Sequence, residues 1–324
     1  MTVDMRPKQP EFDFDKFLID LSKEINEPQP LISLADKPLF TRGNISSISG
    51  KAKSRKTFLI GLFASDYFSN GGGSVMIFDT EQAMYHVQKS TKRIHRLLEW
   101  DENQNDNRLR VFYLREQCTE KRVVFVTRAI THFRPDLVFI DGVRDLLSDF
   151  NSIAESSQIV NLLMRLSSEN NCHICAVLHE NKADNNLRGH AGTELQNKSE
   201  TVISVEADGS ISEVIPKYCR NIPFEKFHFR INESGLPEYC DPEVKPKNAE
   251  KLVSLFSEIL PEGVTMSYAE LRSLVMGKCD VKDKTAEKKI KEASEQSVIV
   301  KNKAGMYYCV DINRNTVTEH ELPF

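Results

Sequence analysis

Short apolar runs that alternate with helical segments constrain the fold of this chain most strongly. From residue 44 to residue 178, runs such as Val75-Met76-Ile77-Phe78 are separated by segments of roughly 10–20 residues with helical apolar spacing. Apolar residues without alternation are typical of strands buried on both faces. Beyond Asn197, the runs 201–206, 212–216 and 227–231 are separated by turn residues only. The pattern predicts an α/β fold, with a mainly parallel sheet, helices on both faces, and antiparallel strands extending one edge.

The remaining segments suggest how the chain is divided. Apolar residues near helical spacing predict a short amphipathic helix over residues 14–25. A stretch with three prolines and few bulky apolar groups, residues 232–248, is the best candidate for a linker. Three helices and a hairpin predicted after it give a winged-helix-like layout. We therefore expect four parts: an arm with a short helix at 1–30, a core at 31–231, a linker at 232–248, and a winged-helix-like domain with a tail at 249–324.

Composition bounds the partners and the compartment. The 324 residues have a net charge of -4, so any nucleic-acid contact must come from a local patch. No apolar stretch near the start is long enough for export or membrane spanning, and an odd number of cysteines, seven, indicates reduced thiols. Cys172 and Cys175 have ligand-like spacing, but they lie in an apolar run without a second pair, which favours core thiols over a zinc site. We expect a cytoplasmic protein without membrane contact.

A glycine and basic loop lies between a predicted strand, 44–49, and a predicted helix. It consists of Gly50, Lys51, Ala52, Lys53, Ser54, Arg55, Lys56 and Thr57. Except at Arg55, which replaces a second glycine, it follows the pattern G-x-x-x-x-G-K-[ST] in the context that a phosphate-binding loop requires. Its amides would hold phosphate, Lys56 would reach the β/γ oxygens and Thr57 would bind Mg²⁺. The plain alternative is a basic turn, but four cations at a helix N-terminus themselves call for an anion.

Acidic residues end two later strands on the same predicted rim of the sheet. Asp141 follows the apolar run 137–140, as a Mg²⁺-binding Walker B carboxylate would. Asp79 and Glu81 follow the run 74–78, and Glu81 is positioned to activate a water molecule. Asp79 has the alternative role of capping the helix that begins near residue 83. Ligands bind at this rim in open parallel sheets, so the sequence predicts a site for ATP and Mg²⁺.

In the order and spacing of these motifs, residues 30–235 resemble the RecA-like ATPases, most closely the RepA/DnaB-type hexameric helicases and ATPases of mobile elements. The resemblance implies that Glu81 is the catalytic glutamate and that His179, after the next strand, is a polar sensor. It also implies that Lys217 and Arg220 reach the nucleotide of a neighbouring subunit. Their segment departs from the family's Lys-x-Arg-Asn-Gly by one extra residue and by Ile222 for glycine. An ordinary strand-end histidine and a basic edge strand are the alternatives.

Two further groups of residues are candidates for DNA binding. In RecA-like proteins the loop at residues 183–192 faces a central channel, which would place Arg188 and His190 on DNA. A surface loop of no special function has the same composition. In the C-terminal domain, basic residues cluster on the third helix and at the hairpin turn, as in helices and wings that contact DNA: Lys284, Lys288, Lys289, Lys291 and Lys303. A solvated face and a protein-docking surface remain open for this cluster.

These observations predict an ATP-hydrolysing protein that acts on DNA, a hexameric helicase-type motor in replication or mobilisation of a bacterial genetic element. Self-association and contacts with replication or mobilisation proteins follow from the same resemblance. A KaiC/RadA-like assembly regulator without unwinding activity is the second hypothesis. A degenerate nucleotide-binding module, suggested by Arg55, is the third.

Overall fold

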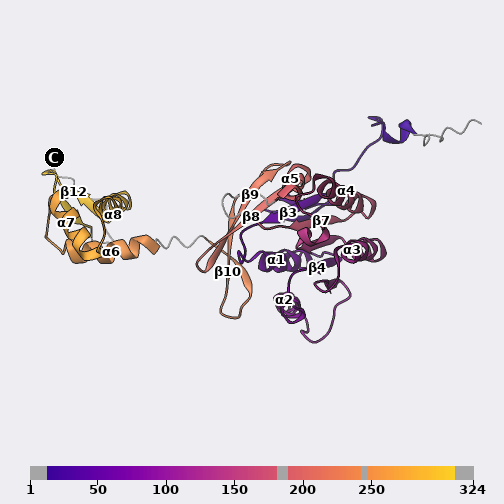
Figure 1. Cartoon of the computed structure of the whole chain (residues 1–324), viewed down its shortest axis with the longest axis horizontal. Helices are drawn as coiled ribbons and strands as arrows, with labels where there is room; N and C mark the ends of the chain where they lie inside the picture. Colours follow the sequence, from indigo (N-terminus) through magenta and orange to yellow (C-terminus); the bar gives the residue numbers. More distant parts are fainter. Residues whose placement is uncertain (1–12, 181–188, 242–246, 311–324) are drawn as a thin grey trace, which may run out of the picture. The chain divides into compact units, whose positions relative to one another are not determined.

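Two compact units, Met1–Pro242 and Glu243–Phe324, make up the computed structural model (Figure 1). The structure describes residues 13–180, 189–241 and 247–310. Within these ranges, no helix is both long enough and apolar enough to pass through a bilayer. Each unit has its own apolar core, so the two are described separately.

A nine-stranded sheet forms the centre of the larger unit, in the order β11-β10-β9-β8-β3-β7-β6-β4-β5. Six neighbouring strands are parallel. They are β3 (Ile45–Ser49), β4 (Val75–Asp79), β5 (Leu109–Tyr113), β6 (Leu137–Asp141), β7 (His173–Val177) and β8 (Thr201–Asp208). Because these strands are parallel, the loops that follow β3, β4, β6 and β7 meet at one rim of the sheet.

Helices cover both faces of this sheet, as the sequence predicts. One core contains side chains of α1 (Lys56–Ser69) and α2 (Met84–Leu97). The opposite core contains side chains of α3 (Thr119–Phe133), α4 (Ile153–Glu169) and α5 (Gly189–Lys198). Side chains of alternate residues divide between the cores along a strand: Leu137 and Phe139 of β6 point to the first, Val138 and Ile140 to the second. The continuous apolar runs of the sequence arise because both faces are covered.

Antiparallel strands extend the sheet beyond β8, also as predicted. They are β9 (Ile211–Cys219), β10 (Phe227–Ile231) and β11 (Pro237–Cys240). The last one corrects the linker expected over residues 232–248, because 237–240 pair with β10. Pro237 is tolerated there because an edge strand leaves its outer amide positions unpaired. A separate hairpin, β1 (Pro30–Leu34) and β2 (Lys37–Thr41), was not predicted from the sequence.

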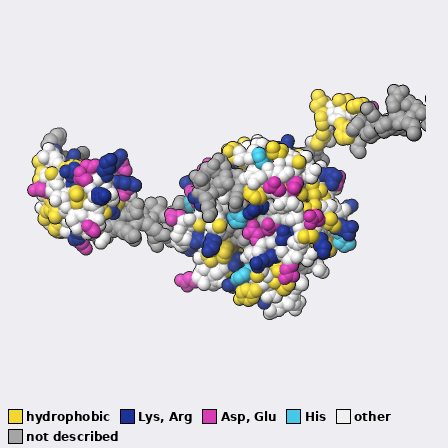
Figure 2. All heavy atoms as spheres, in the orientation of Figure 1, with side chains coloured by type: hydrophobic (Ala, Val, Ile, Leu, Met, Phe, Trp, Pro, Cys, Tyr) yellow, Lys and Arg dark blue, Asp and Glu magenta, His cyan; other side chains and the backbone are white. Residues whose placement is uncertain are grey.

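The helix predicted over residues 14–25 is wrong. Only a 3-10 turn, η1 (Phe14–Phe17), forms there. Its apolar side chains have no core beneath them: Leu18 is 73% exposed and Leu21 is 94% exposed. A short isolated helix is marginal without a packing surface, which explains why apolar spacing alone misled the prediction. Figure 2 shows apolar side chains on this segment, next to the grey N-terminal residues.

The smaller unit consists of three helices and a hairpin. They are α6 (Lys247–Ile259), α7 (Tyr268–Cys279), α8 (Asp283–Glu295), β12 (Ile299–Lys301) and β13 (Tyr307–Cys309). Phe256, Leu271, Ile290 and Val298 belong to their common core. Met266 forms a further bridge with Tyr307 beside the hairpin. The elements lie where the sequence predicts them, and a winged-helix function for them stays a prediction.

Candidate nucleotide-binding site

Gly50 begins the loop between β3 and α1, and its neighbours leave no room for a side chain. A Cβ atom at this position would lie 2.5 Å from both the Oγ atom of Ser54 and the carbonyl oxygen of Val205. Lys53 and Arg55 adopt left-handed backbone angles, with φ of 65° and 71°. The loop thus wraps closely around the N-terminus of α1, where free amide groups favour an anion.

Lys56 is buried at the base of this loop, and no carboxylate of the described residues lies in hydrogen-bonding contact with it. Its Nζ atom donates to the carbonyl oxygens of Gly50 (2.9 Å) and Lys51 (3.0 Å). Burial lowers the pKa of Lys56, whereas the charges of Asp141 and Glu81 raise it. Ser54 is 4% exposed, and its Oγ atom has no hydrogen-bond partner within the described ranges. A buried ammonium group beside an unpartnered hydroxyl group suits phosphate oxygens, which would accept from both.

Thr57 and Asp141 form the second part of the site. The Thr57 hydroxyl donates to Oδ2 of Asp141 over 2.8 Å. Burial, followed by the negative charge of Asp79, raises the pKa of Asp141 to about 7. A divalent cation would remove the cause of this shift, and hydroxyl and carboxylate oxygens are ligands that Mg²⁺ accepts. The residues present therefore fit a Mg²⁺ ion between the loop and the end of β6.

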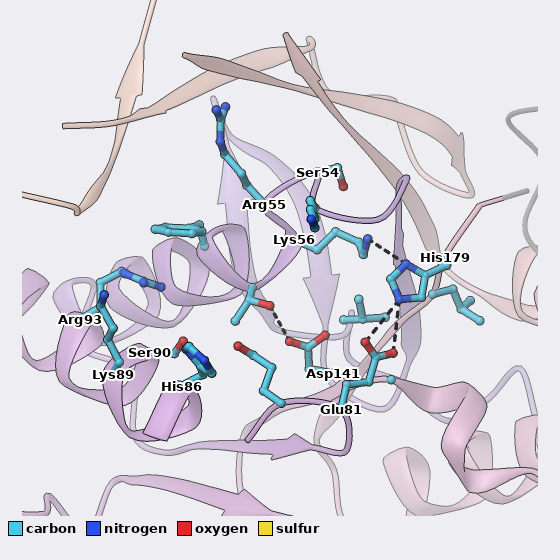
Figure 3. Close-up of a pocket in the computed structure, with 17 residues that line it drawn as sticks. Ser54, Arg55, Lys56, Glu81, His86, Lys89, Ser90, Arg93, Asp141 and His179 are labelled. Atoms are coloured by element: carbon cyan, nitrogen blue, oxygen red, sulfur yellow. Dashed lines mark hydrogen bonds and ion pairs between the residues drawn. The ribbon is translucent and has the colours of Figure 1, made fainter. Parts of the chain in front are cut away.

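Asp79 and Glu81, after β4, have different tasks. Asp79 is buried, and its Oδ1 atom accepts from the backbone amides of Glu81 (3.1 Å) and Gln82 (2.8 Å). It fixes the turn before α2, although α2 itself begins after an Ala83 N-cap without a side-chain cap. Glu81 is left free to extend into the pocket, in reach of an attacking water molecule (Figure 3).

His179, directly after β7, lies between the loop lysine and Glu81. Its Nδ1 atom is 3.4 Å from Nζ of Lys56, and its Nε2 atom is 3.3 Å from Oε1 of Glu81 (Figure 3). The hydrogen bond with His179 is the main cause that lowers the pKa of Glu81. The histidine thus connects the phosphate-binding residue with the candidate base, which a strand-end histidine without a role would not do.

Arg55, the departure from the loop pattern, points away from the pocket's centre toward the β8–β9 turn. Its guanidinium group donates to the carbonyl oxygens of Gly209 and Ser210 and to the Ser212 hydroxyl, the last two over 3.1 Å. The left-handed angle that favours glycine is therefore kept, and the side chain anchors a neighbouring hairpin. The residue that casts doubt on the loop pattern is thus accommodated by contacts outside the loop.

These residues line a single pocket of about 480 Å³, which also includes residues not predicted from the sequence. His86, Lys89, Ser90 and Arg93 contribute to it from α2. Their i, i+3, i+4 and i+7 spacing on one helix face was the signal that could have revealed them. Behind the loop, buried Glu180 accepts from the hydroxyls of Ser49 and Ser204, both over 2.8 Å, and joins the ends of β3 and β8.

Lys217 and Arg220 are not among the residues of this pocket. Lys217, on β9, lies 3.9 Å from Glu206, and Arg220 donates to the carbonyl oxygen of Lys198 over 2.9 Å. Arg220 is exposed to solvent beyond the strand. Their predicted service to a neighbour's nucleotide stays a prediction.

The DNA-binding candidates are distributed over several elements. Arg188 lies outside the described residues, and His190 is in the first turn of α5, because the helix begins at Gly189 inside the loop expected over 183–192. Lys284, Lys288, Lys289 and Lys291 are on α8, opposite its buried Ala286 and Ile290, and Lys303 is in the β12–β13 turn. Lys288 and Lys291 lie within 4 Å of Glu292 and Glu295, respectively, one helical turn later.

Sheet topology and site together define this chain as a RecA-like P-loop protein. No protein-family model matches it, and no curated protein matches it in sequence. Among solved structures, it is similar to the RadB recombinase (16% identity, TM-score 0.47, covering 62% of this chain and 93% of the other). It is also similar to the ATPase domain of a DnaB-like helicase (15% identity, TM-score 0.48, covering 62% of this chain and 86% of the other).

Proposed function

We propose that this chain binds and hydrolyses MgATP, and that it acts on DNA as a helicase-type motor built from several copies. The convergence of Lys56, Thr57, Asp141, Glu81 and His179 on one pocket is the observation that supports the ATPase. They come from four separate segments that only the folded sheet brings together. Acting on DNA and assembling into a hexamer rest on the resemblance to RepA/DnaB-type helicases.

Each side chain has a task that its contacts support. Lys56 exchanges the carbonyl oxygens of Gly50 and Lys51 for phosphate oxygens when nucleotide enters. Thr57 and Asp141 would hold Mg²⁺, which supplies positive charge to the phosphates when bound. Glu81 accepts a proton from the attacking water, and His179 orients the Glu81 carboxylate. Arg220 would stabilise the transition state in a neighbouring copy.

The exposed apolar residues of the N-terminal segment support self-association. Phe17, Leu18 and Leu21 are each more than 70% exposed, which is costly unless another surface covers them. A second copy of the chain is the partner that an oligomeric ATPase supplies.

Two variants and one DNA substrate test the proposal. Lys56→Ala is expected to lose MgATP binding, whereas Glu81→Gln is expected to bind MgATP and to hydrolyse it on the order of 10²-fold more slowly. Phosphate release is measured with and without single-stranded DNA, and Lys92→Ala, outside the pocket, is the matched control. Wild-type turnover that persists in Lys56→Ala would exclude this site.

Strand displacement separates the motor from the assembly regulator. The pairing of α8 lysines with glutamates on the same helix leaves less free charge for DNA, which favours the regulator. We expect the protein to unwind a forked duplex in the presence of ATP. DNA-stimulated hydrolysis and ATP-dependent assembly without unwinding would assign the regulator function instead.

A further inference from the structure

Arg93 is a buried cation without a counter-charge among the described residues. It is 8% exposed, and its Nε atom has no hydrogen-bond partner in the part of the chain that the structure describes. Its guanidinium group lies 3.7 Å from the ring centroid of Phe58, the residue after Thr57. Burying an unpaired charge costs free energy, so such residues are normally paired with a protein or ligand anion.

Two more basic side chains lie on the same face of α2. His86 and Lys89 line the pocket with Arg93, and neither forms an ion pair within residues 13–180, 189–241 and 247–310. Figure 3 shows them with Ser90 on one side of Thr57 and Asp141, while Lys56, His179 and Glu81 lie on the other side. The pocket thus has two basic regions, of which the motif-bearing loop supplies only one.

The direction of a bound nucleotide follows from this arrangement. The γ-phosphate belongs beside Lys56, Glu81 and His179, where hydrolysis takes place. The amides at the start of α1 hold the phosphates that precede it. The nucleoside end must then extend toward Phe58 and α2, away from the Lys56–His179–Glu81 contacts.

We propose that His86, Lys89 and Arg93 form a second anion subsite, which binds a phosphate group at the nucleoside end of the nucleotide. The subsite rests on the proposed nucleotide-binding function and names residues beyond the loop motif. Arg93 donates to the phosphate from a fixed position over Phe58, and Lys89 and His86 add charge at the open side. The phosphate is either the α-phosphate of an ordinary nucleotide or a further phosphate on the ribose.

Calorimetric titration of the full chain with MgADP tests the subsite. Arg93→Met keeps an apolar stem over Phe58 and removes the charge, and Lys92→Met is the matched control on the same helix. We expect Arg93→Met to bind MgADP about tenfold or more weakly, as for a lost hydrogen bond to a charged group, and Lys92→Met to bind like wild type. Equal affinities of Arg93→Met and wild type for MgADP and for 3'-phosphorylated MgADP would overturn the subsite.

Two ligands distinguish the sources of the phosphate. If Arg93 holds the α-phosphate, Arg93→Met loses the wild type's discrimination between the two diastereomers of ADP carrying sulfur at the α-phosphorus. If it holds a ribose phosphate, the tenfold loss is confined to ADP with a 3'-phosphate. Either result supports the subsite.

Thermal unfolding without ligand separates binding from packing. Removing an unpaired buried charge is expected to leave the melting temperature of Arg93→Met equal to or above that of wild type. A lower melting temperature together with weaker binding would mean that Arg93 only holds α2 on α1, which overturns the subsite. Failure of wild type to bind MgADP contradicts the proposed function itself, and is therefore distinguishable from failure of the subsite.

Discussion

The Nε2 atom of His179 lies 3.3 Å from Oε1 of Glu81, and this pair connects the ends of β7 and β4 at the rim of the sheet. The contact stabilises the carboxylate form of Glu81 and lowers its pKa. A base must be deprotonated to act, so His179 helps to keep Glu81 in its active form as the pH falls.

Replacement of His179 by alanine is therefore expected to raise the pKa of Glu81. The acidic limb of the pH–rate profile should move to higher pH, because Glu81 becomes protonated earlier on acidification. Turnover at neutral pH should fall by about 10- to 100-fold through loss of orientation, with a small change in KM. Steady-state hydrolysis from acidic to mildly basic pH measures both effects. An acidic limb unchanged in position would show that the contact does not govern Glu81.

Arg55 makes a second prediction, which concerns backbone strain. Its φ of 71° costs less for glycine than for alanine, and both substitutions lose the contacts with the β8–β9 turn. Arg55→Gly should therefore be more stable than Arg55→Ala by about 0.5–1 kcal/mol in urea denaturation. Both variants should bind MgATP, and the amides of the turn after Asp208 should exchange faster with solvent. The opposite order of stability would mean that the loop gives up its left-handed angle.

The parallel sheet and most of the rim could be predicted because each strand and each chemical group is encoded locally. Lys56, Thr57 and Asp141 follow strands in recognisable patterns, and the structure places them within one pocket. The α2 face was overlooked because Arg93 acquires significance only when Phe58 and burial deprive it of solvent. Helical spacing alone cannot distinguish such a residue from a solvated arginine.

The sequence was less informative where burial decides the conformation. Residues 14–25 have the apolar spacing of a helix, yet Leu18 and Ile25 remain exposed and no helix continues past Phe17 within this described segment. Residues 237–240 contain a proline and few bulky apolar side chains, yet pairing with β10 makes them a strand. Both outcomes depend on a partner surface, which local propensity does not specify.

Buried His173 gives a pH-dependent stability that is independent of the pocket. Burial lowers its pKa to about 4, although its hydrogen bond with the Thr41 carbonyl oxygen (2.8 Å) raises it. The unfolded chain binds a proton near pH 6.5 and the folded chain only near pH 4, so acidification through this window favours unfolding. Its contribution is complete above about pH 6.5 and should decline by up to about 3 kcal/mol as the pH falls to about 4.

His173→Gln removes this titration while retaining a hydrogen-bond donor. Urea denaturation between about pH 4 and pH 7 should show a smaller slope of stability with pH in this variant than in wild type. His132→Gln, on the exposed side of α3, is the control and should keep the wild-type slope. Identical slopes in His173→Gln and wild type would mean that other groups cause the acid sensitivity.

Arg220 tests assembly and catalysis together. It is exposed after β9 and does not line the pocket of its own chain, so its charge can act more readily on the nucleotide of a neighbour. Arginines that act across an interface contribute about 10³–10⁵ in rate. Arg220→Ala is expected to bind MgATP and to assemble, yet to hydrolyse ATP more slowly by a factor within this range. Arg230→Ala, which changes another exposed edge arginine, should hydrolyse ATP like wild type.

Mixing two inactive variants provides the decisive measurement for this arginine. Arg220→Ala retains an intact pocket and Lys56→Ala retains the arginine, so a mixed interface with the first variant's pocket and the second variant's arginine is complete. Activity should therefore reappear on mixing and vary with the ratio of the two proteins, whereas each variant stays inactive alone. Subunit exchange is followed in the same samples by energy transfer between labelled copies. A mixture that exchanges subunits but remains inactive would show that Arg220 does not act on a neighbour's nucleotide, and that its contact with the carbonyl oxygen of Lys198 is its role.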